Sequence, residues 1–554
     1  MSDLLAGAGV LIAAAVSAAT ILLPTGRLRS IAMLAALVLF PALILGDQWH
    51  SHQIVDLRDH TSRLVALVLL GVVAAVVLAY AFRRWPILLP LAVVAALPFR
   101  VPLHAGGDTA NLLVPLYLVI AGGVLSKAFG EWQQGGGVDL GAGFFAWRGS
   151  SLAESAVRKT GRRPQIDPPA LLPYVLAGVV LLYALQTLYS PDFSKGLQNA
   201  CFFFVPFSLV YGLLRDVSWD WKLLTLVLWV VAVEAVCFVV VGSVEWGTRS
   251  LFWNDQVIRS NEFHTYFRVN SVFWDPNIYG RYLALVAVVA MSALLWARER
   301  KTLVLLTALV FVLWLGLFPT FSQSSFAALL AGLAVLAALK WSLRWTLVAV
   351  GAFAVLGVLV VLFTGGRASL DRINIDTSGR ANLVSGGIHL FAQRPIYGYG
   401  SGSFPKAYRE HVETHKAPVS VSHTEPITIA AEQGILGVAA YIALVVTALW
   451  TMAAGLRPSL LSLSVTRAGG VGGGGSRTDR GPPAGPPPPA TGSARLQPIA
   501  RAAVLATFVA LLVHTMAYAG FFEDPITWVL LGVGASLAAA DRPGAASSAP
   551  RRVR

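Results

Sequence analysis

Residues 303–319 read LVLLTALVFVLWLGLFP, and residues 323–339 read QSSFAALLAGLAVLAAL, with three residues between them. Neither segment contains a charged side chain. A helix needs roughly 20 consecutive apolar residues to cross the hydrocarbon core of a bilayer, and both segments approach that length. This stretch therefore predicts two successive transmembrane helices.

The same pattern recurs along the rest of the 554 residues, of which 56% are hydrophobic and 13% charged. Soluble domains typically carry about 25% charged residues. We therefore predict an all-α polytopic membrane protein with about 14–15 transmembrane helices and a large, partly helical outer loop. Residues 86–98 are short and bounded by prolines, so a re-entrant segment is the alternative there. The predicted spans are 4–23, 31–46, 64–82, 86–98, 111–129, 171–189, 199–214, 223–243, 277–296, 303–319, 323–339, 343–363, 427–450, 500–520 and 525–540.

The basic residues predict which side of the membrane each loop faces. With these spans, eight loops or tails rich in Lys and Arg all fall on one side, which the positive-inside rule makes cytoplasmic. The first span has no basic segment before it and Arg27 and Arg29 after it, so we expect an uncleaved helix with its N-terminus outside. The net charge of +14 is explained by topology, and nucleic-acid binding is not indicated.

The predicted organisation follows from these spans and from composition. Residues 456–498 contain runs of Gly and Pro with few apolar side chains, so we expect this cytoplasmic loop to be disordered. The full division is N-terminal transmembrane helices (1–129), a cytoplasmic linker (130–170), a transmembrane core (171–363), an outer catalytic loop (364–426), a transmembrane helix (427–455), the disordered loop (456–498), C-terminal transmembrane helices (499–541) and a cytoplasmic tail (542–554).

Two long outer loops, 244–276 and 364–426, exceed what a helix connection needs. The second holds seven Lys or Arg, five Asp or Glu and four His residues, which predicts a structured outer segment. Metal binding is not favoured. His411 and His415 have zinc-like spacing, but no third ligand is obvious. Cys201 and Cys237 lie in apolar runs, so a disulfide across an outer loop is not indicated.

The first outer loop ends in Arg268 and then Asp275-Pro276-Asn277. Asp275 can cap the next helix, with Pro276 at its first position. Helix capping does not explain Arg268 or Asn277. A polar group at the mouth of a bundle needs a partner, and neither residue has one in the capping interpretation. The polar patch 320–325 is typical of side chains that bond back to their own helix.

The second outer loop predicts a helix that begins near Ser378 and ends before Pro395. Arg380 then lies in its first turn, where a cation is unfavourable unless an anion or solvent compensates it. Arg394-Pro395 follows, and then Tyr399 between glycines at 398, 400 and 402. Glycines at alternate positions let the backbone pass close to a ligand or to another helix.

The final motif places His423 ahead of a membrane helix that begins at Pro426. Glu432 lies about two turns inside this helix, where a carboxylate is costly and is either functional or paired. A lone histidine at an interface is more often a solvated residue, but Arg268, Arg380 and Glu432 lie on the same side. Asp524-Pro525, in the last outer turn after His514, fits a helix cap.

Together these motifs resemble the O-antigen ligase/polymerase family of membrane glycosyltransferases over roughly residues 200–540. The carriers are Asp275-Pro276-Asn277, the Ser-rich helix end, Ser378-Gly379-Arg380, Arg394-Pro395 with the glycines after it, and His423 ahead of 432–437 (EQGILG). Two positions depart from the family pattern: Thr424 replaces an Asn, and Ser322-Gln323 replaces Ser-Arg. The missing basic role then falls to Arg259, Arg367 or Arg372.

The resemblance implies a metal-independent glycosyltransferase without a cofactor, in a bacterial cytoplasmic (inner) membrane, with its active site on the outer, periplasmic side. Its partners would be a polyprenyl-diphosphate-linked glycan donor, a glycan or glycolipid acceptor and membrane lipids. A sugar transporter or lipid flippase and a non-catalytic envelope assembly factor remain the alternatives. The expected catalytic residues are His423, Arg380 and Arg268, and the expected substrate-binding residues are Asn277, Arg259, Arg372, Arg394, Tyr399 and Glu432.

Overall fold

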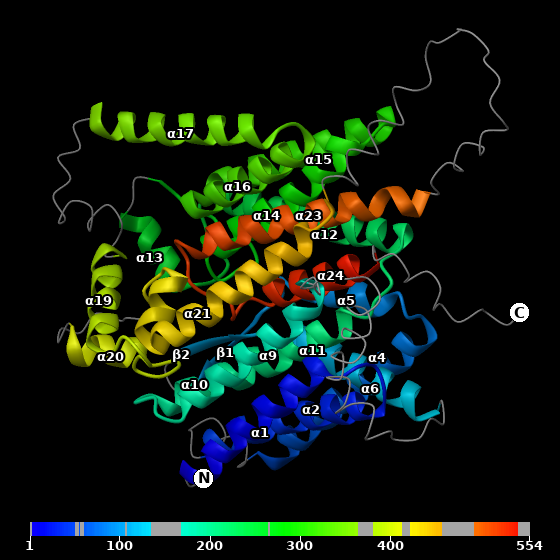
Figure 1. The fold of residues 1–554 in the computed structure, drawn as a ribbon, viewed down its shortest axis with the longest axis vertical. Helices are drawn as coiled ribbons and strands as arrows, with labels where there is room; N and C mark the ends of the chain where they lie inside the picture. Colours follow the sequence, from blue (N-terminus) through cyan, green and yellow to red (C-terminus); the bar gives the residue numbers. More distant parts are fainter. Residues whose placement is uncertain are drawn as a thin grey trace, which may run out of the picture.

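The structure is a computed structural model that describes residues 3–49, 55, 60–105, 108–133, 168–263, 266–363, 380–412, 421–456 and 492–540. Most of these residues form helices that run side by side through one bundle (Figure 1). Twelve helices within the described ranges are long and apolar enough to cross a membrane. Two shorter apolar helical stretches, Leu343–Ala352 and Pro525–Ala540, accompany them. The predicted all-helical polytopic class is confirmed.

A helix is present at every predicted span. The N-terminal helices are α1 (Asp3–Leu22), α2 (Arg27–Asp47), α4 (Thr61–Arg84), α5 (Leu88–Ala96), α6 (Val114–Gln133) and α9 (Pro168–Thr187). The span predicted at 199–214 is composite, formed by α10 (Phe193–Asn199), a π-helical turn η2 (Ala200–Phe204) and α11 (Val205–Leu214). The remaining helices are α12 (Trp221–Thr248), α13 (Asp255–Phe263), α14 (Pro276–Trp296), α15 (Arg300–Leu317), the 3₁₀ turn η3 (Phe318–Thr320), α16 (Gln323–Lys340), α17 (Leu343–Phe363), α19 (Arg380–Gln393), α20 (Phe404–His411), α21 (Glu425–Ala453), α23 (Gly492–Thr515) and α24 (Pro525–Ala540).

The segment predicted to be short or re-entrant is α5, which has nine residues. A helix of that length rises only about 14 Å and cannot cross a core of about 30 Å alone. After α5 the chain forms an antiparallel hairpin of β1 (Val101–Ala105) and β2 (Asp108–Leu112). No sequence pattern predicted this hairpin, which is a small addition to the helical fold.

One predicted boundary is wrong, because α23 begins at Gly492, inside the segment 456–498 that we expected to be disordered. The rest of that expectation lies on residues 457–491, outside the described part of the chain. Residues 134–167 and 364–379, which hold most of the linker and the start of the outer catalytic loop, also lie outside it. Within the outer loop, α19 begins at Arg380 and ends before Pro395, as predicted.

Helix α21 is broken at Gly434, whose φ and ψ are 63° and −161°. A broken membrane helix must have its freed backbone groups paired by other protein groups. The loop at 395–402 does this: the amide of Ile435 donates to the carbonyl of Pro395 at 2.8 Å. In return, the amides of Tyr399 and Gly400 donate to Ala431 and Glu432 at 3.1 and 2.7 Å.

The three glycines of this loop allow its close passage over neighbouring helices. Gly398, Gly400 and Gly402 all have positive φ, at 66°, 101° and 75°. A Cβ atom on each would clash with backbone atoms, those of Glu432, Ser190 and Gly196 respectively. Of the two roles left open by the sequence, close approach to another helix therefore explains the glycines.

We expect Gly398→Ala to destabilise the protein beyond the about 1–2 kcal/mol that a left-handed alanine costs. The added methyl group meets backbone atoms of α21, and overpacking of this kind costs about 1–3 kcal/mol more. Gly455→Ala is the matched control, because Gly455 also has positive φ, at 70°, but no heavy atom within 4 Å of an added Cβ. Equal losses of thermal stability in detergent for the two variants would contradict this packing account.

Candidate active site at the α19–α20 end of the bundle

A cavity of about 610 Å³ opens at the end of the bundle where α10, α13, α19 and α20 gather (Figure 1). We call this the α19–α20 end. The cavity wall is formed by α10, α14, α20, α21, the turn before α24 and Arg100, which follows α5. Its charged lining consists of Arg100, Asp192, Lys195, Arg281, His423, Glu425, Glu432, Glu523 and Asp524. Basic and acidic side chains therefore line the same cavity.

His423 lines this cavity in a strained turn just before α21. Its φ is 62°, which is uncommon for a residue with a side chain and occurs often at functional positions. The neighbours hold this turn against the segment after α23. The Thr424 hydroxyl donates to the Met516 carbonyl at 3.0 Å, and Glu425 accepts from the amides of Gly520 and Phe521 at 2.7 and 3.1 Å. Thr424, a departure from the family pattern, thus helps to position His423.

The electrostatic surroundings keep the His423 imidazole neutral. Burial lowers its pKa below the ordinary value of 6.5, and the Arg380 cation lowers it further, while Asp275 acts weakly in the opposite direction. A neutral imidazole can accept a proton at neutral pH, and an imidazolium cannot. His423 therefore has the protonation state that a general base requires.

Arg268 is held in a fixed orientation by three groups. Its Nε donates to the Thr320 carbonyl at 2.9 Å, and its Nη2 donates to Oδ1 of Asn277 at 3.1 Å. The Asn261 side chain accepts a hydrogen bond from the Arg268 amide at 3.0 Å and donates one to the Arg268 carbonyl at 2.9 Å. Asp275 caps α14 through the amide of Asn277 at 2.6 Å, as predicted, so the cap also places the partner of Arg268. Arg268 and Asn277, which helix capping alone did not explain, are therefore hydrogen-bonded to each other.

Arg380 is the first residue of α19 and reaches across to the segment after α23. Its Nη1 donates to the Ala517 carbonyl at 3.4 Å, and its charge lies within electrostatic reach of His423 and Arg268. Of the three residues predicted to be catalytic, only His423 lines the cavity, and Arg380 lies within electrostatic reach of the other two. Within the described residues, the Ala517 carbonyl is the hydrogen-bond acceptor that Arg380 contacts.

Tyr518 lines the same cavity and lies between His423 and His514, although it was not predicted from the sequence. Its ring centroid is 6.4 Å from that of His423 and 5.8 Å from that of His514, and the Arg281 guanidinium carbon is 6.0 Å away. Burial raises the pKa of the Tyr518 hydroxyl, so the group stays protonated. No sequence signal marked this residue.

Arg281 was also missed, although a signal was present. It lies inside the apolar helix α14, where an ionisable residue is by default functional or paired, the rule that singled out Glu432. It forms a buried ion pair with Asp524, with Nη2 and Oδ2 separated by 2.7 Å. Asp524 also caps α24 through the amide of Ile526 at 2.9 Å, so the predicted cap is present and has a second task.

The remaining predicted substrate-binding residues are placed differently. Glu432 lines the cavity, but its carboxylate accepts from the amides of Gly402 and Phe404 at 2.8 and 3.0 Å, so it anchors the glycine loop. The Arg394 guanidinium stacks on the buried Tyr399 ring, 4.3 Å from its centroid, outside the cavity wall. Arg259 is exposed on α13 and does not line the cavity. Arg372 lies outside the described residues, and so does His415, one of the two histidines with zinc-like spacing.

Residues 308–442, about a quarter of the chain, match the sequence model of the O-antigen ligase family. The matched region contains Arg380, His423 and Glu432, whereas Arg268 and Asn277 precede it. A search of curated proteins found no match for the chain. The family resemblance is confirmed: this chain is a multi-pass membrane protein that carries an O-antigen ligase domain, the type of domain that transfers glycans.

Proposed function

We propose that this protein is a metal-independent glycosyltransferase that takes a glycan from a polyprenyl diphosphate on the outer face of a bacterial cytoplasmic membrane. The observation that carries the proposal is the neutral His423 imidazole in a polar cavity, with the Arg380 cation within electrostatic reach of both His423 and Arg268. A base next to fixed cations is what transfer from a diphosphate leaving group requires.

In the proposed reaction, the acceptor hydroxyl oxygen attacks the anomeric carbon of the donor sugar. Its proton passes to His423 as the new C–O bond forms. The bond between the anomeric carbon and the diphosphate oxygen breaks, and the electron pair leaves with the diphosphate. Arg268 and Arg380 stabilise that anion, because guanidinium groups form paired, charge-assisted hydrogen bonds with phosphate oxygens. One displacement inverts the anomeric configuration, and isolation of a covalent glycosyl-enzyme would contradict this step.

The proposed orientation rests on the distribution of charge. The opposite end of the bundle carries Arg29, Lys127 and Arg215 around Asp216, with further basic loops nearby in the sequence. Basic loops favour the cytoplasmic side, so the α19–α20 end would face outward. The acceptor and the glycan would then meet outside the cytoplasm.

A transporter or flippase is the main alternative, and the break in α21 is a feature of that class. In transporters, the freed backbone groups of broken helices bind the substrate or ion. Here the loop at 395–400 binds those groups, so they are not available for cargo. A non-catalytic assembly factor would not need a neutral base at the cavity, and it would tolerate the loss of His423.

Reconstitution into liposomes distinguishes these functions. We expect the wild-type protein to release free polyprenyl diphosphate from a lipid-linked oligosaccharide when an acceptor and EDTA are both present. A ladder of products would identify a polymerase, and a single added glycan would identify a ligase. Movement of the intact donor between leaflets without release of polyprenyl diphosphate would contradict the proposal and establish the transporter.

A further inference from the structure

Helix α12 presents a buried carboxylate to the segment that carries Arg268. Glu245 lies in the last turn of α12, and its side chain is fully buried. Its Oε2 accepts from the amides of Asn270 and Ser271 at 3.2 and 2.7 Å. Glu245 does not line the polar cavity, so a substrate bound there would not contact it. A carboxylate in a membrane helix is costly and is either functional or paired, and this one is bound to backbone groups.

The turn that Glu245 binds is strained. Ser271 has a φ of 51°, in the left-handed region that a residue with a side chain rarely adopts. Its hydroxyl donates to the Phe238 carbonyl of α12 at 2.8 Å, and the Phe273 amide closes the turn on the Asn270 carbonyl at 2.9 Å. Strained backbone persists only where its surroundings determine it strongly, and it clusters at functional sites. Helix α12 therefore supplies contacts that keep this turn in place.

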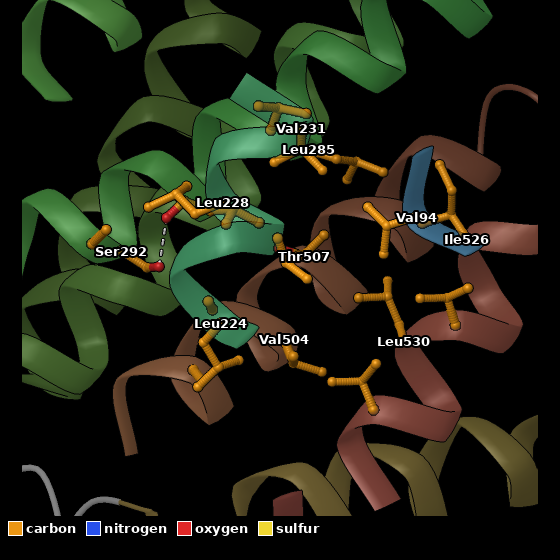
Figure 2. Close-up of a pocket in the computed structure, with 18 of the residues that line it drawn as sticks. Val94, Leu224, Leu228, Val231, Leu285, Ser292, Val504, Thr507, Ile526 and Leu530 are labelled. Carbon is orange, nitrogen blue, oxygen red and sulfur yellow. Dashed lines mark hydrogen bonds between the residues drawn. The ribbon is translucent and has the colours of Figure 1, made fainter. Parts of the chain in front are cut away.

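The two halves of α12 differ in how they pack. Near its start, Leu224 and Leu228 line an apolar cavity of about 250 Å³ between this helix, α5, α14, α23 and α24 (Figure 2). In the outer half, the Phe238 ring packs edge-on against Phe273, with ring centroids 5.2 Å apart. Apolar contact has no preferred direction. The hydrogen bonds of Glu245 add the direction, and they do so where α12 meets the turn.

The position of this turn affects where the Arg268 guanidinium lies. Arg268 precedes the turn by two residues, and the Val269 amide between them donates to the Pro319 carbonyl at 3.1 Å. The two bonds of the guanidinium, to Thr320 and to Asn277, both depend on where this segment lies. A displacement of about 1 Å at a positioned group can cost about 100-fold in rate.

Two other carboxylates make the same kind of contact at this end of the bundle. Glu425 accepts two amides from residues 520–521, and Glu432 accepts two from residues 402–404. Hydrogen bonds to a charged acceptor are roughly twice as strong as neutral ones, so each of these carboxylates fixes a loop firmly. Both of those loops face the polar cavity, through Gly520 and Gly402. The turn before α14 is thus held by the same device as the loops of the cavity wall.

We propose that Glu245 is a positioning residue for glycosyl transfer, which fixes the turn at 270–271 and thereby orients the Arg268 guanidinium toward the donor diphosphate. This role rests on the proposed function and extends it to α12, which precedes the region of the family match. Glu245 acts through Arg268 and takes no part in bond making or breaking. A carboxylate inside an apolar helix is the signal that singled out Glu432, and it was present here as well.

The test is a double-mutant cycle on the purified full-length protein in nanodiscs, with the rate of polyprenyl diphosphate release as the readout. Glu245→Ala should lower kcat/KM by roughly 10-fold to 100-fold, because it removes the acceptor of both amides. In the Arg268→Ala background the same substitution should cost less than about 2-fold, since the group that it positions is gone. Glu245→Gln keeps an oxygen that can accept both amides, and it should retain most of the wild-type rate.

Glu432→Ala is the matched contrast, because Glu432 holds a different loop by the same chemistry. Its cost should be the same with Arg268 and with Arg268→Ala. Glu262→Ala, on an exposed side chain of α13 in the same outer loop, controls for charge and should keep wild-type rates. Hydrogen exchange over residues 266–276 reports on the turn directly and should be faster in Glu245→Ala than in the wild type.

The proposal is overturned if Glu245→Ala costs as much in the Arg268→Ala background as it does alone, because Glu245 would then act on general stability. Unchanged hydrogen exchange over residues 266–276 would overturn it as well. If unfolding temperatures show that Glu245→Ala does not fold, Glu245→Asp replaces it in the cycle, since the shorter side chain draws the carboxylate away from both amides. Normal turnover by the Glu245 variant beside a slow Arg268→Ala would overturn this inference alone. Absence of turnover by the wild type would instead remove the proposed function and this inference with it.

Discussion

Replacement of His423 by alanine should slow glycan transfer by about 10²-fold to 10⁴-fold, the contribution of a positioned general base. The donor should still bind, because the arginines and the cavity remain. The loss should therefore be in kcat, with little change in KM for the donor. The measurement is the rate of polyprenyl diphosphate release by purified protein at saturating donor and acceptor.

His389→Ala is the matched control, because His389 is an exposed histidine on α19 outside the cavity wall. We expect this variant to retain wild-type rates. Equal rates for wild type and His423→Ala would show that His423 is not the base.

The pH profile gives a second test of the same residue. The base must be neutral, so activity falls as the pH drops through the pKa of His423, which burial and Arg380 hold below 6.5. The acidic limb of kcat/KM should therefore lie below pH 6.5. The Arg380 cation disfavours the imidazolium form of His423. Arg380→Ala should therefore raise the pKa of His423 and move the acidic limb of the profile to higher pH. The same substitution should also lower the rate.

The second large effect is expected at Arg268. Arg268→Ala should reduce kcat/KM by about 10²-fold to 10³-fold, the usual cost of removing one fixed donor from a charged transition state. Arg268→Lys should recover little of this loss. A lysine ammonium cannot hold the Thr320 carbonyl and the Asn277 amide together and still present donors to a phosphate.

Arg409→Ala, on the exposed face of α20, is the control for a general change in outer charge. Rates should be measured over a range of salt concentrations, because an effect of net charge is screened and a direct contact is not. If Arg268→Lys matched the wild type, charge alone would suffice, and the fixed orientation of Arg268 would not matter for the reaction.

Local sequence signals predicted the helices and their ends. Apolar runs placed every span, and Asp275-Pro276 and Asp524-Pro525 marked helix starts that the structure contains. The start of α19 at Arg380 was predicted in the same way. These features depend on residues within a few positions of each other, so one sequence suffices to find them.

Contacts between distant segments could not be predicted. Glu432 was recognised as functional or paired, but its partners, Gly402 and Phe404, are set by the loop crossing the break in α21. Arg100 follows an apolar segment too short to span, and nothing local indicates that it reaches the cavity. Tyr518 has no sequence signal either, since a single tyrosine near a helix end is common at membrane interfaces.

Donor turnover in the presence of EDTA tests the central claim most directly. The substrate is a polyprenyl-diphosphate-linked oligosaccharide with an acceptor, and the proteins are the wild type, His423→Ala and Arg380→Ala. Release of polyprenyl diphosphate by the wild type despite EDTA, with severe loss in both variants, is the result that a metal-independent transferase with these residues predicts. An intact donor with the wild type, or variants as active as the wild type, would contradict the assignment and favour transport.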